Sequence, residues 1–438
     1  MPQPAVRAVL AATALCLACA VEVAAAPCSA GRLTHAAALA SDWTDDLPGR
    51  CRQIALGDLP APSTSNSNVR TIVPPPAGAL PKVPAGFAVR RFYQGDAPGR
   101  LLRAQYGGDL FLAESYSGRV RVLRPSGTCT LGSTSVFADG LNLPFGIAFY
   151  PRGPGAQYIY VAENQRVVRF PYQAGQLKAG AKPQLIASLP VGAGQLPGQG
   201  HWTRDIAFGV GAHTLYASIG SFSNVQTGGE DETGRAKIIA MDPLGGDRRT
   251  YATGLRNPVA ISVSPVTGSL WVTTDERDGL GDQLVPDFVA NVTYRQFYGW
   301  PWLYMGGKID PRHAGDVPAG LPAVTTPRVL LQAHSASLGS AFYTGSAFPA
   351  EYRGSLFVAL HGSWNRKNPI GPKVVRVPFD AQGRAMPFYE DFMTGFTVSD
   401  YKVWGRPVGV AVGKDGALYV SEDANRTIWC VAPKSQMP

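Results

Sequence analysis

The sequence predicts an all-β protein: a six-bladed β-propeller with four-stranded antiparallel blades, preceded by an N-terminal extension. Three observations predict this fold. Glycine and proline account for 50 and 37 of the 438 residues, and they interrupt the chain too often for long helices. Hydrophobic residues make up 45% of the chain, which is enough for a sizeable core and argues against disorder. The third observation is a pattern that recurs six times.

Each copy of the pattern contains an alternating apolar strand, a glycine or Asp-Gly turn, an aromatic-rich strand that ends in small or acidic residues, and a third strand. Repeats of this kind are typical of propeller blades, which bury their faces against neighbouring blades. Six blades can close a ring. A β-sandwich of hairpins is the alternative, but it does not require six similar units. The copies start 42 to 81 residues apart, at Leu101, Leu143, His201, Asn257, Leu338 and Arg406.

The segment before the repeats begins with an expected export signal, residues 1–26. Arg7 supplies the positive charge, Val9–Val21 is apolar, and Val23–Ala25 offers small residues for cleavage. Glu22 ends the apolar run before it reaches the ~20 residues of a membrane span. The mature protein is therefore expected to be periplasmic or secreted.

Residues 27–87 are expected to form an N-terminal extension with a Pro-rich linker, and residues 88–438 the six-bladed catalytic domain. The extension holds a short helical stretch near Leu33–Ala40. The linker is rich in proline, serine and asparagine, as in Leu59–Ser63 and Val73–Pro76. Such a composition favours loops over regular structure.

The mature chain keeps four cysteines, an even number that predicts two disulfides in an oxidising compartment. Three pairings are open. The favoured one joins Cys28 to Cys51 within the extension and Cys129 to Cys430 between an early and the last strand. No CxxC pair or Cys/His cluster remains in the mature sequence, which argues against a zinc site.

Two loops supply candidate acid–base and anion-binding residues. In Gly198–Arg204, His201 stands just before a strand, and its near-neutral pKa suits proton transfer from a hydroxyl. In Gly254–Pro258, Arg256 and Asn257 also directly precede a strand, and arginine binds carboxylates with a two-pronged fork. Taken singly, each loop is more often an exposed surface turn than a functional site.

Three further loops have unusual polar content. Asp275–Asp282 holds four carboxylates and two glycines, which suits a hard cation such as Ca²⁺ or, alternatively, a solvated acidic turn. Leu360–Arg366 and Trp404–Pro407 place an arginine beside a tryptophan, which would otherwise pack on a neighbouring blade. Equivalent loops of successive blades would face one mouth. Several arginines there imply a polyanionic ligand, and the acidic loop implies a cation beside it.

These motifs resemble those of the soluble pyrroloquinoline quinone (PQQ)-dependent sugar dehydrogenases, and within them the L-sorbosone dehydrogenase-like branch. The resemblance runs from about residue 88 to 432, and it rests on the order of the motifs more than on any single one. The motifs are GHWTR from Gly200, SIGSFSNV from Ser218, GLRNPV from Gly254, ERDGLGDQLVPDF from Glu276, FYGWP from Phe297, HSASLGSAFY from His334, HGSWNR from His361 and GRPVGVAV from Gly405.

The resemblance implies PQQ above the central channel, with Ca²⁺ bridging cofactor and protein. His201 then corresponds to the general base. Arg256 and Asn257 correspond to PQQ contacts, with Arg256 near the reacting carbonyl, and Arg406 corresponds to a partner of a PQQ carboxylate. Gly200 stands where some relatives carry an aspartate before the histidine.

The remaining site residues also follow from the resemblance. Glucose-oxidising relatives carry a lysine near the HGSWNR position, where the cationic candidates here are Arg366 and His361. The calcium loop maps to Thr274, Asp275 and Glu276, whose backbone carbonyls are the implied ligands.

The implied activity is that of a quinoprotein oxidoreductase. It passes a hydride from the C1 carbon of an aldose, or of a sugar aldehyde such as sorbosone (as its hydrate), to PQQ. The electrons then go to an external acceptor, a periplasmic cytochrome or a quinone. The net charge of +9 would help docking on an acidic partner, although aiding solubility is the favoured explanation. Export and the absence of basic stretches interleaved with aromatics argue against a nucleic-acid partner.

Two other functions stay open at the level of sequence. One is a non-enzymatic propeller that binds a carbohydrate or a protein at its channel mouth. The other is a Ca²⁺-dependent lactonase, which would need carboxylate and amide side chains from several blades around one ion. Its candidates would be Glu163, Asn164, Asp205 and Asp423. A lactonase has no need for the arginines, and this feature separates the two enzymes.

Overall fold

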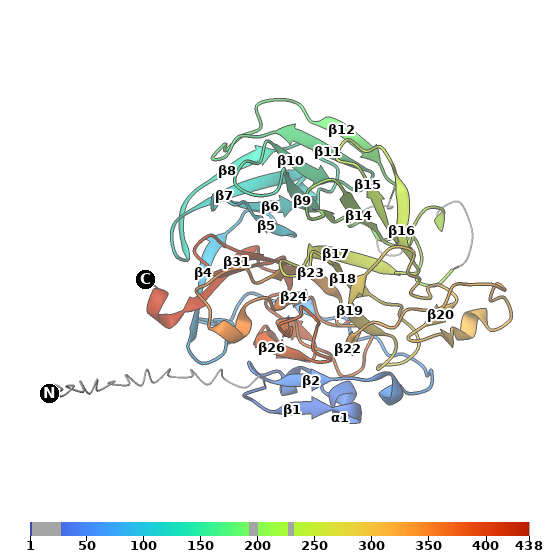
Figure 1. Ribbon diagram of the computed structural model, residues 1–438. Coiled ribbons are helices and arrows are strands. Elements are labelled where there is room, and N and C mark those ends of the chain that lie inside the picture. The colour runs from blue at the N-terminus through green and yellow to red at the C-terminus, as the bar shows by residue number, and fades with distance from the viewer. Residues whose placement is uncertain (2–27, 192–199, 227–231, 438) are drawn as a thin grey trace.

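The computed structural model confirms the six-bladed propeller (Figure 1), and it describes residue 1 and residues 28–191, 200–226 and 232–437. The expected export signal, residues 1–26, lies outside the described residues except for Met1. Each of the six repeats forms one antiparallel blade. From the channel outward, the first blade consists of β5 (Leu102–Ala104), β6 (Leu110–Glu114), β7 (Arg119–Gly127) and β8 (Thr130–Ala138). The second blade consists of β9 (Gly146–Tyr150), β10 (Tyr158–Ala162), β11 (Arg166–Pro171) and β12 (Gln184–Ser188). The third blade consists of β13 (Ile206–Phe208), β14 (Leu215–Ile219), β15 (Lys237–Met241) and β16 (Arg249–Thr253).

The last three blades follow the same order, with one insertion and one strand drawn from the start of the chain. The fourth blade consists of β17 (Asn257–Val263), β18 (Leu270–Asp275), β19 (Pro286–Val292) and β22 (Val329–Ala333). The fifth blade consists of β23 (Ser337–Phe342), β24 (Leu356–Leu360), β25 (Lys373–Val377) and β26 (Tyr389–Met393). The sixth blade consists of β29 (Pro407–Val412), β30 (Leu418–Glu422), β31 (Thr427–Pro433) and β4 (Phe87–Gln94). The insertion between β19 and β22 carries the hairpin β20 (Leu303–Tyr304) and β21 (Lys308–Ile309).

The ring closes by joining the two ends of the propeller. Strand β4 precedes the first blade in sequence but pairs antiparallel with β31 as the outer strand of the sixth blade. Blade 1 is tied to this blade by the Cys129–Cys430 disulfide, and Cys28 pairs with Cys51, so the favoured cysteine pairing is confirmed. Each innermost strand contacts the next one, and β29 contacts β5.

Glycines allow the innermost strands to approach so closely. A Cβ atom at Gly409 in β29 would lie 2.6 Å from the backbone nitrogen of Leu102 in β5, and one at Gly339 in β23 would meet the carbonyl oxygen of Val408. Any side chain would push these strands apart, so glycine is required where the blades meet at the channel.

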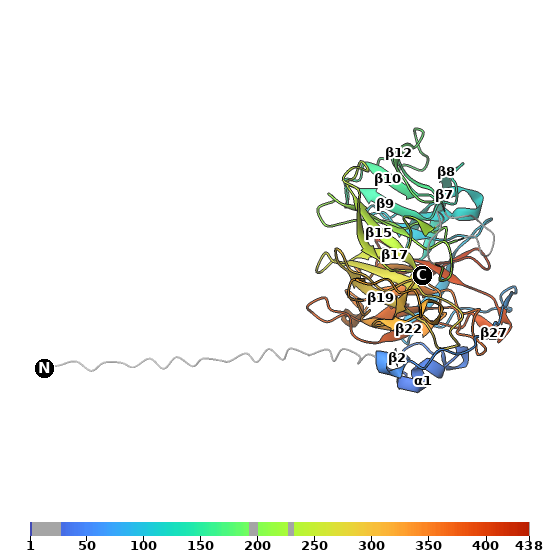
Figure 2. The same cartoon turned by 90° about the vertical axis from the view of Figure 1, so that its right-hand side faces the viewer.

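The extension packs on the outer edge of the fifth blade. Strand β2 (Cys51–Gln53) pairs antiparallel with β26, and β1 (Arg32–Thr34) pairs parallel with β2. Helix α1 (His35–Ala40) contacts β22, and Figures 1 and 2 show α1 and β2 along the same edge of the molecule. Further along, β3 (Thr71–Ile72) joins a small sheet with β28 (Lys402–Val403) and β27 (Thr397–Ser399).

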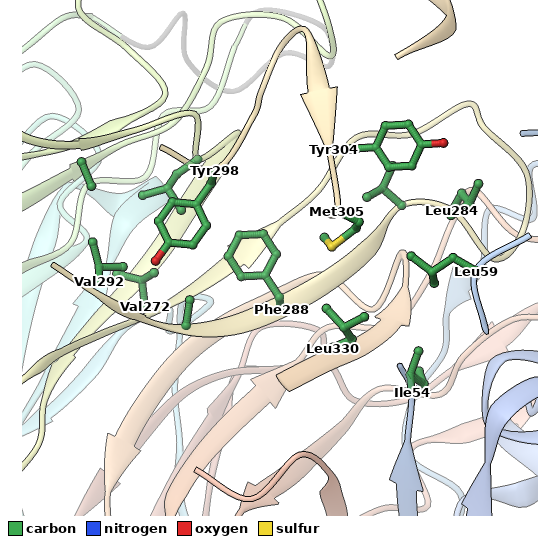
Figure 3. Packing of buried hydrophobic residues seen from close by; sticks show 14 of the residues in the cluster. Ile54, Leu59, Val272, Leu284, Phe288, Val292, Tyr298, Tyr304, Met305 and Leu330 are labelled. Atoms are coloured by element: carbon green, nitrogen blue, oxygen red, sulfur yellow. The ribbon is translucent and has the colours of Figure 1, made fainter. Parts of the chain in front are cut away.

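Apolar side chains of the extension also enter the propeller core. Ile54 and Leu59 belong to one buried cluster with Leu284, Phe288 and Leu330 of the fourth blade. Figure 3 shows them beside these side chains. Burying this apolar surface stabilises the docked extension by ~25 cal/mol for each Å² removed from water. No helix in the described part of the chain is long and apolar enough to cross a membrane.

A buried ion network fastens the extension to blade 5. Arg52 contacts Asp391 at 2.7 Å and Asp46 at 2.9 Å, and Lys373 contacts the same two carboxylates at 3.0 and 2.6 Å. All four side chains are buried. Burial opposes ionisation of Asp391, but Arg52 and Lys373 outweigh it and keep the pKa of this carboxyl below its usual value.

We expect Asp391→Ala to lower the free energy of unfolding by ~3–5 kcal/mol, because it leaves two buried cations without one of their counter-charges. Urea unfolding of the mature protein measures this loss. The matched control is Asp380→Ala, which removes an exposed ion pair with Arg384 and should change stability little. Equal stability of both variants would contradict the assigned role of the network.

Candidate active site

The loops that carry the predicted residues meet at one end of the central channel. Within each blade the second strand runs antiparallel to the innermost one. The residues before each innermost strand and those after each second strand therefore lie at the same end, which we call the mouth. The predicted residues placed there are His201, Arg256, Asn257, Asp275, Glu276, His361 and Arg406.

His201 is held as a neutral imidazole with one free nitrogen. Its Nδ1 lies 2.9 Å from the carbonyl oxygen of Ser221 and 3.1 Å from the Ser221 hydroxyl. A carbonyl only accepts hydrogen bonds, so Nδ1 carries the proton and Nε2 keeps a lone pair. Nε2 has no hydrogen-bond partner among the described residues.

The surroundings of His201 keep it unprotonated. Burial lowers the pKa of this imidazole well below its usual value, Arg256 lowers it further, and Arg204 and Arg235 add to the effect. The hydrogen bond to Ser221 opposes this shift without cancelling it. A neutral imidazole at neutral pH can take a proton from a substrate hydroxyl.

Ser221 and Gly220 link His201 to the neighbouring blade. The Ser221 backbone N–H donates to the Arg256 carbonyl at 2.7 Å, and its carbonyl accepts from the His201 N–H at 3.0 Å. A Cβ atom at Gly220 would meet Asn257 Oδ1 and would lie 2.6 Å from the His201 Cβ. The absence of a side chain at Gly220 thus allows His201 and Asn257 to lie side by side.

Gly200 precedes His201 in a conformation that glycine favours, with a φ of +89°. A Cβ atom there would lie 2.8 Å from the Phe222 ring. The structure therefore explains why this chain has no aspartate before the histidine: the side chain would be strained and would collide with Phe222.

Arg256 spans from blade 4 to the acidic loop. Its Nη1 donates to the carbonyl oxygens of Glu276 at 2.9 Å and Asp275 at 3.3 Å, and its Nε donates to the Asn224 carbonyl at 3.2 Å. It also lies 3.5 Å from the Asp275 carboxylate and 3.7 Å from that of Asp278. One buried guanidinium therefore organises the whole loop.

The acidic loop holds more buried carboxylate than its cations neutralise. Burial raises the pKa of Asp275 against the opposing effect of Arg256, and it raises the pKa of Glu276 to about 7. Burial, followed by the charge of Asp275, raises the pKa of Asp287 well above its usual value. An added cation would favour the ionised form of all three groups.

The oxygen atoms around this loop fit a hard cation such as Ca²⁺. Asn257 Oδ1 and Thr274 Oγ1 are buried and have no partner among the described residues. The Asp275 and Glu276 carbonyls accept from Arg256, but each has a second lone pair. The Thr274 carbonyl accepts from the Ser337 hydroxyl at 3.1 Å. Within the described ranges, no three His, Cys, Asp or Glu side chains group to hold a metal, so a cation would depend on these carbonyl and amide oxygens.

A second charged cluster centres on Asp423. Its carboxylate accepts from Arg100 at 2.5 Å, from His361 Nε2 at 3.0 Å and from Arg406 at 3.1–3.2 Å. Burial opposes ionisation of Asp423, but His361, Arg100 and Arg406 hold its pKa well below the usual range. Burial lowers the pKa of His361 to about 4, although Asp423 opposes the shift. Two arginines thus share one carboxylate, and the Arg406 side chain remains 32% exposed.

The Arg366 side chain points away from the charged cluster of the mouth and toward the extension. Its residue is 2% exposed, and its guanidinium donates to the carbonyls of Asn368, Asp282, Leu39 and Ser41 at 2.7–3.2 Å. Arg366 therefore fastens the extension to its own loop. Of the two cationic candidates in the HGSWNR motif, only His361 lies in the charged cluster.

Arg100 and Ser221 are mouth residues that the sequence did not single out. Arg100 stands just before the first innermost strand, the place that Arg406 takes before the sixth. An alignment of the six repeats would show that Arg100 and Arg406 occupy equivalent positions. Ser221 contributes mainly backbone atoms, which no residue pattern identifies.

The opposite end of the channel holds a cavity of about 690 Å³. It is lined by all six innermost strands and by the turns that follow them, including residues 103–106, 147–149 and 410–416. Arg103 reaches into the channel and pairs with the buried Asp205 at 2.7 Å. None of the predicted site residues lines this cavity, so the candidate chemistry belongs to the mouth.

A protein-family model described as TrAA12-like matches residues 81–290 and 320–434 of the chain. An uncharacterized protein of Borreliella burgdorferi is 29% identical over 357 residues, covering 80% of this chain and 90% of that protein. A pyrroloquinoline quinone-dependent pyranose dehydrogenase of Coprinopsis cinerea is 25% identical over 413 residues. That match covers 79% of this chain and 54% of the relative, so the chain spans about half the length of that protein.

Solved structures share the fold. The holo form of the PQQ domain of Coprinopsis cinerea pyranose dehydrogenase has a TM-score of 0.65 and 22% identity, covering 82% of this chain and 98% of that one. The apo form of the soluble aldose sugar dehydrogenase from Escherichia coli has a TM-score of 0.59 and 17% identity, covering 80% and 100%.

Proposed function

Because the chain belongs to the TrAA12-like family, we propose that it is a PQQ-dependent sugar dehydrogenase whose active site is the mouth. The observation that carries this proposal is the arrangement of His201. A neutral imidazole with a free Nε2 lies beside a buried arginine and an oxygen-rich loop. The named Coprinopsis cinerea relative supports PQQ as the cofactor.

The charged groups of the mouth fit PQQ, which carries three carboxylates. Arg406 is half-exposed and shares its only ion-pair partner in the described chain, Asp423, with Arg100. This cluster therefore keeps positive charge for a bound carboxylate, and arginine binds carboxylates through two parallel hydrogen bonds. Arg406, with His361 and Arg100 behind it, would hold one end of the cofactor, and Arg256 with Asn257 would hold the other.

Bound PQQ supplies a two-electron acceptor for the hydride that leaves the C1 carbon of the sugar. His201 accepts the hydroxyl proton of that carbon at Nε2, while its Nδ1–H stays bonded to the Ser221 carbonyl. The positive charge of Arg256 favours negative charge that develops nearby. The hydrogen bond to Ser221 keeps the ring oriented and fixes its tautomer.

Ca²⁺ belongs to the same proposal. The Asp275 and Glu276 carbonyls, with Thr274 Oγ1 next to them in sequence and Asn257 Oδ1 on the paired strand β17, would hold it, and it would offset the surplus of buried carboxylate around Asp287. A divalent cation at this loop would polarise a cofactor oxygen beside it.

The substrate is an aldose, or a sugar aldehyde such as sorbosone oxidised as its hydrate. The protein works after export, in the periplasm or outside the cell. A periplasmic cytochrome or a quinone takes up the electrons. These parts of the proposal rest on the sequence motifs and on the expected signal of residues 1–26.

The direct test is to titrate the mature protein with PQQ, with and without Ca²⁺, and to follow the cofactor absorbance. Saturable binding that requires Ca²⁺ is the expected result, followed by sugar-dependent reduction of an artificial dye. Absence of PQQ binding under both conditions would overturn the proposal and favour a propeller that only binds carbohydrate or protein.

Arg406→Ala should weaken PQQ binding by about tenfold or more, because a charge-assisted hydrogen-bond pair contributes ~1.5–3 kcal/mol. The same absorbance titration measures it. Arg384→Ala is the control, since Arg384 pairs with Asp380 on the exposed surface. Unchanged PQQ affinity in Arg406→Ala would remove this residue from the cofactor site.

The carboxylates that a lactonase would need are already committed to other partners. Glu163 accepts from the Asn142 backbone and pairs with Arg166. Asp205 pairs with Arg103, and Asp423 is surrounded by two arginines and His361. Because these groups lie in separate ion pairs, they do not form one cation site, and the mouth favours the dehydrogenase.

A further inference from the structure

Two aromatic side chains lie together at the mouth, one of them directly after His201 in sequence, and the proposed chemistry does not use them. Tyr116 stands in a short 3₁₀ turn, η3 (Ser115–Ser117), that follows β6 of blade 1. Trp202 follows His201 directly and leads into β13 of blade 3. Their ring centroids are 5.7 Å apart, with an angle of 56° between the planes.

Contacts from three blades hold this pair in place. The Trp202 ring packs edge-on against the buried Phe145 at 6.0 Å, and the Arg100 guanidinium lies 5.6 Å from its centroid. On the Tyr116 side, the Ser115 hydroxyl donates to the Pro144 carbonyl at 2.5 Å and fixes the turn. The pair is therefore preorganised, which lowers the entropy cost of binding a ligand.

The outward parts of both rings are unused. Tyr116 is 46% exposed, and neither its hydroxyl nor the Trp202 Nε1 has a hydrogen-bond partner in the described parts of the chain. Trp202 packs on a core cluster with one part of its ring and is partly exposed, so both side chains can offer surface and a polar end to a ligand.

The chemistry of the two rings matches a pyranose. A pyranose presents apolar C–H groups on its faces and hydroxyls around its edge. An aromatic ring buries the C–H face, while the phenol hydroxyl and the indole N–H can bond the hydroxyls. A short open-chain aldehyde offers no such face. The pair therefore favours a substrate in its closed ring form over a short open-chain aldehyde.

We propose that Tyr116 and Trp202 form a stacking platform that binds the closed pyranose ring of the substrate next to His201. This inference rests on the proposed function for the identity of the reaction. It assigns the platform to substrate affinity, not to the chemical step, because His201 already supplies the proton acceptor of the proposed reaction. Ring sugars are then the preferred substrates over short aldehydes.

The test compares Tyr116→Ala and Tyr116→Phe in the PQQ-loaded, Ca²⁺-containing enzyme with glucose and with glyceraldehyde. Tyr116→Ala should raise KM for glucose about fivefold to tenfold and should act on KM rather than on kcat. Tyr116→Phe keeps the ring and should stay within about threefold of wild type. With glyceraldehyde the three proteins should differ by less than about twofold.

A second readout does not depend on turnover. Saturation-transfer NMR of glucose with the same proteins reports sugar binding to the aromatic rings. Tyr106→Ala is the matched control, because Tyr106 is similarly exposed but lines the opposite end of the channel. The signal should fall in Tyr116→Ala and should persist in Tyr116→Phe and Tyr106→Ala.

The outcomes separate the two proposals. An active enzyme whose KM for glucose is unchanged in Tyr116→Ala overturns the platform and leaves the dehydrogenase standing. An inactive wild type in which glucose still binds through Tyr116 supports the platform and overturns the dehydrogenase. A wild type that neither oxidises nor binds glucose overturns the platform together with a glucose-type substrate.

Discussion

Turnover of the His201→Ala enzyme is expected to fall by about 10²–10⁴-fold, the usual contribution of a positioned general base, while its affinity for PQQ stays close to that of wild type. The reason is that different residues of the mouth carry out proton transfer and cofactor binding. His201 offers a lone pair but no positive charge, since burial and Arg256 keep it neutral. Cofactor carboxylates therefore depend on the arginines, and the loss falls on the chemical step.

The matched control is His213→Ala. His213 is exposed in the turn between β13 and β14, at the other end of the same blade, and its removal should leave turnover unchanged. Dye reduction under saturating PQQ and Ca²⁺ measures both variants. Near-normal turnover in His201→Ala would remove this residue from the catalytic role.

The pH dependence provides an independent check of the same assignment. Only the unprotonated imidazole accepts a proton, so activity falls when the pH drops through the pKa of His201. Burial, Arg256, Arg204 and Arg235 lower that pKa. We therefore expect the acid limb of kcat/KM to lie well below pH 6.5, the ordinary value for histidine. An acid limb at or above pH 6.5 would show that the buried ring does not control the rate.

The fold could be predicted because its signal is local and repeated six times. Each repeat fixes a blade, and six blades fix the ring. The long-range pairings could not be predicted: β4 joins β31 across more than 300 residues, and β2 joins β26 in another blade. Neither β4 nor β2 carries a sequence pattern that identifies its partner, since any sheet edge can accept an extended segment.

In the candidate site, the directions of single side chains likewise could not be predicted from the sequence. A motif places a residue at the mouth, but packing decides which way its side chain points. His361 and Arg366 come from one motif, yet His361 reaches Asp423 and Arg366 binds carbonyls of the extension. Arg100, one of the three partners of Asp423, lies outside every motif, and it reaches this carboxylate because the ring brings the first and last blades together.

Gly220→Ala is expected to lower kcat by about 10²-fold, although it adds a single methyl group. The added Cβ would meet Asn257 Oδ1 and would lie 2.6 Å from the His201 Cβ. The His201 Cβ is bonded directly to its backbone, so His201 cannot move away at small cost. A displacement approaching 1 Å at a reacting group costs about 10²-fold in rate, and overpacking of this kind also destabilises a protein by ~1–3 kcal/mol.

Gly155→Ala is the matched control, because it also replaces a glycine with alanine but at a position where the added methyl group meets no neighbour. Gly155 lies in the turn between β9 and β10 with no atom near its virtual Cβ, so that variant should keep full activity. In Gly220→Ala, PQQ affinity should fall much less than turnover, because Arg100 and Arg406 of the first and sixth blades still hold the cofactor. Loss of turnover with retained cofactor would show that the spacing between His201 and Asn257 sets the rate. Full turnover in Gly220→Ala would show that the base tolerates displacement, and the close approach of these two residues would then serve packing alone.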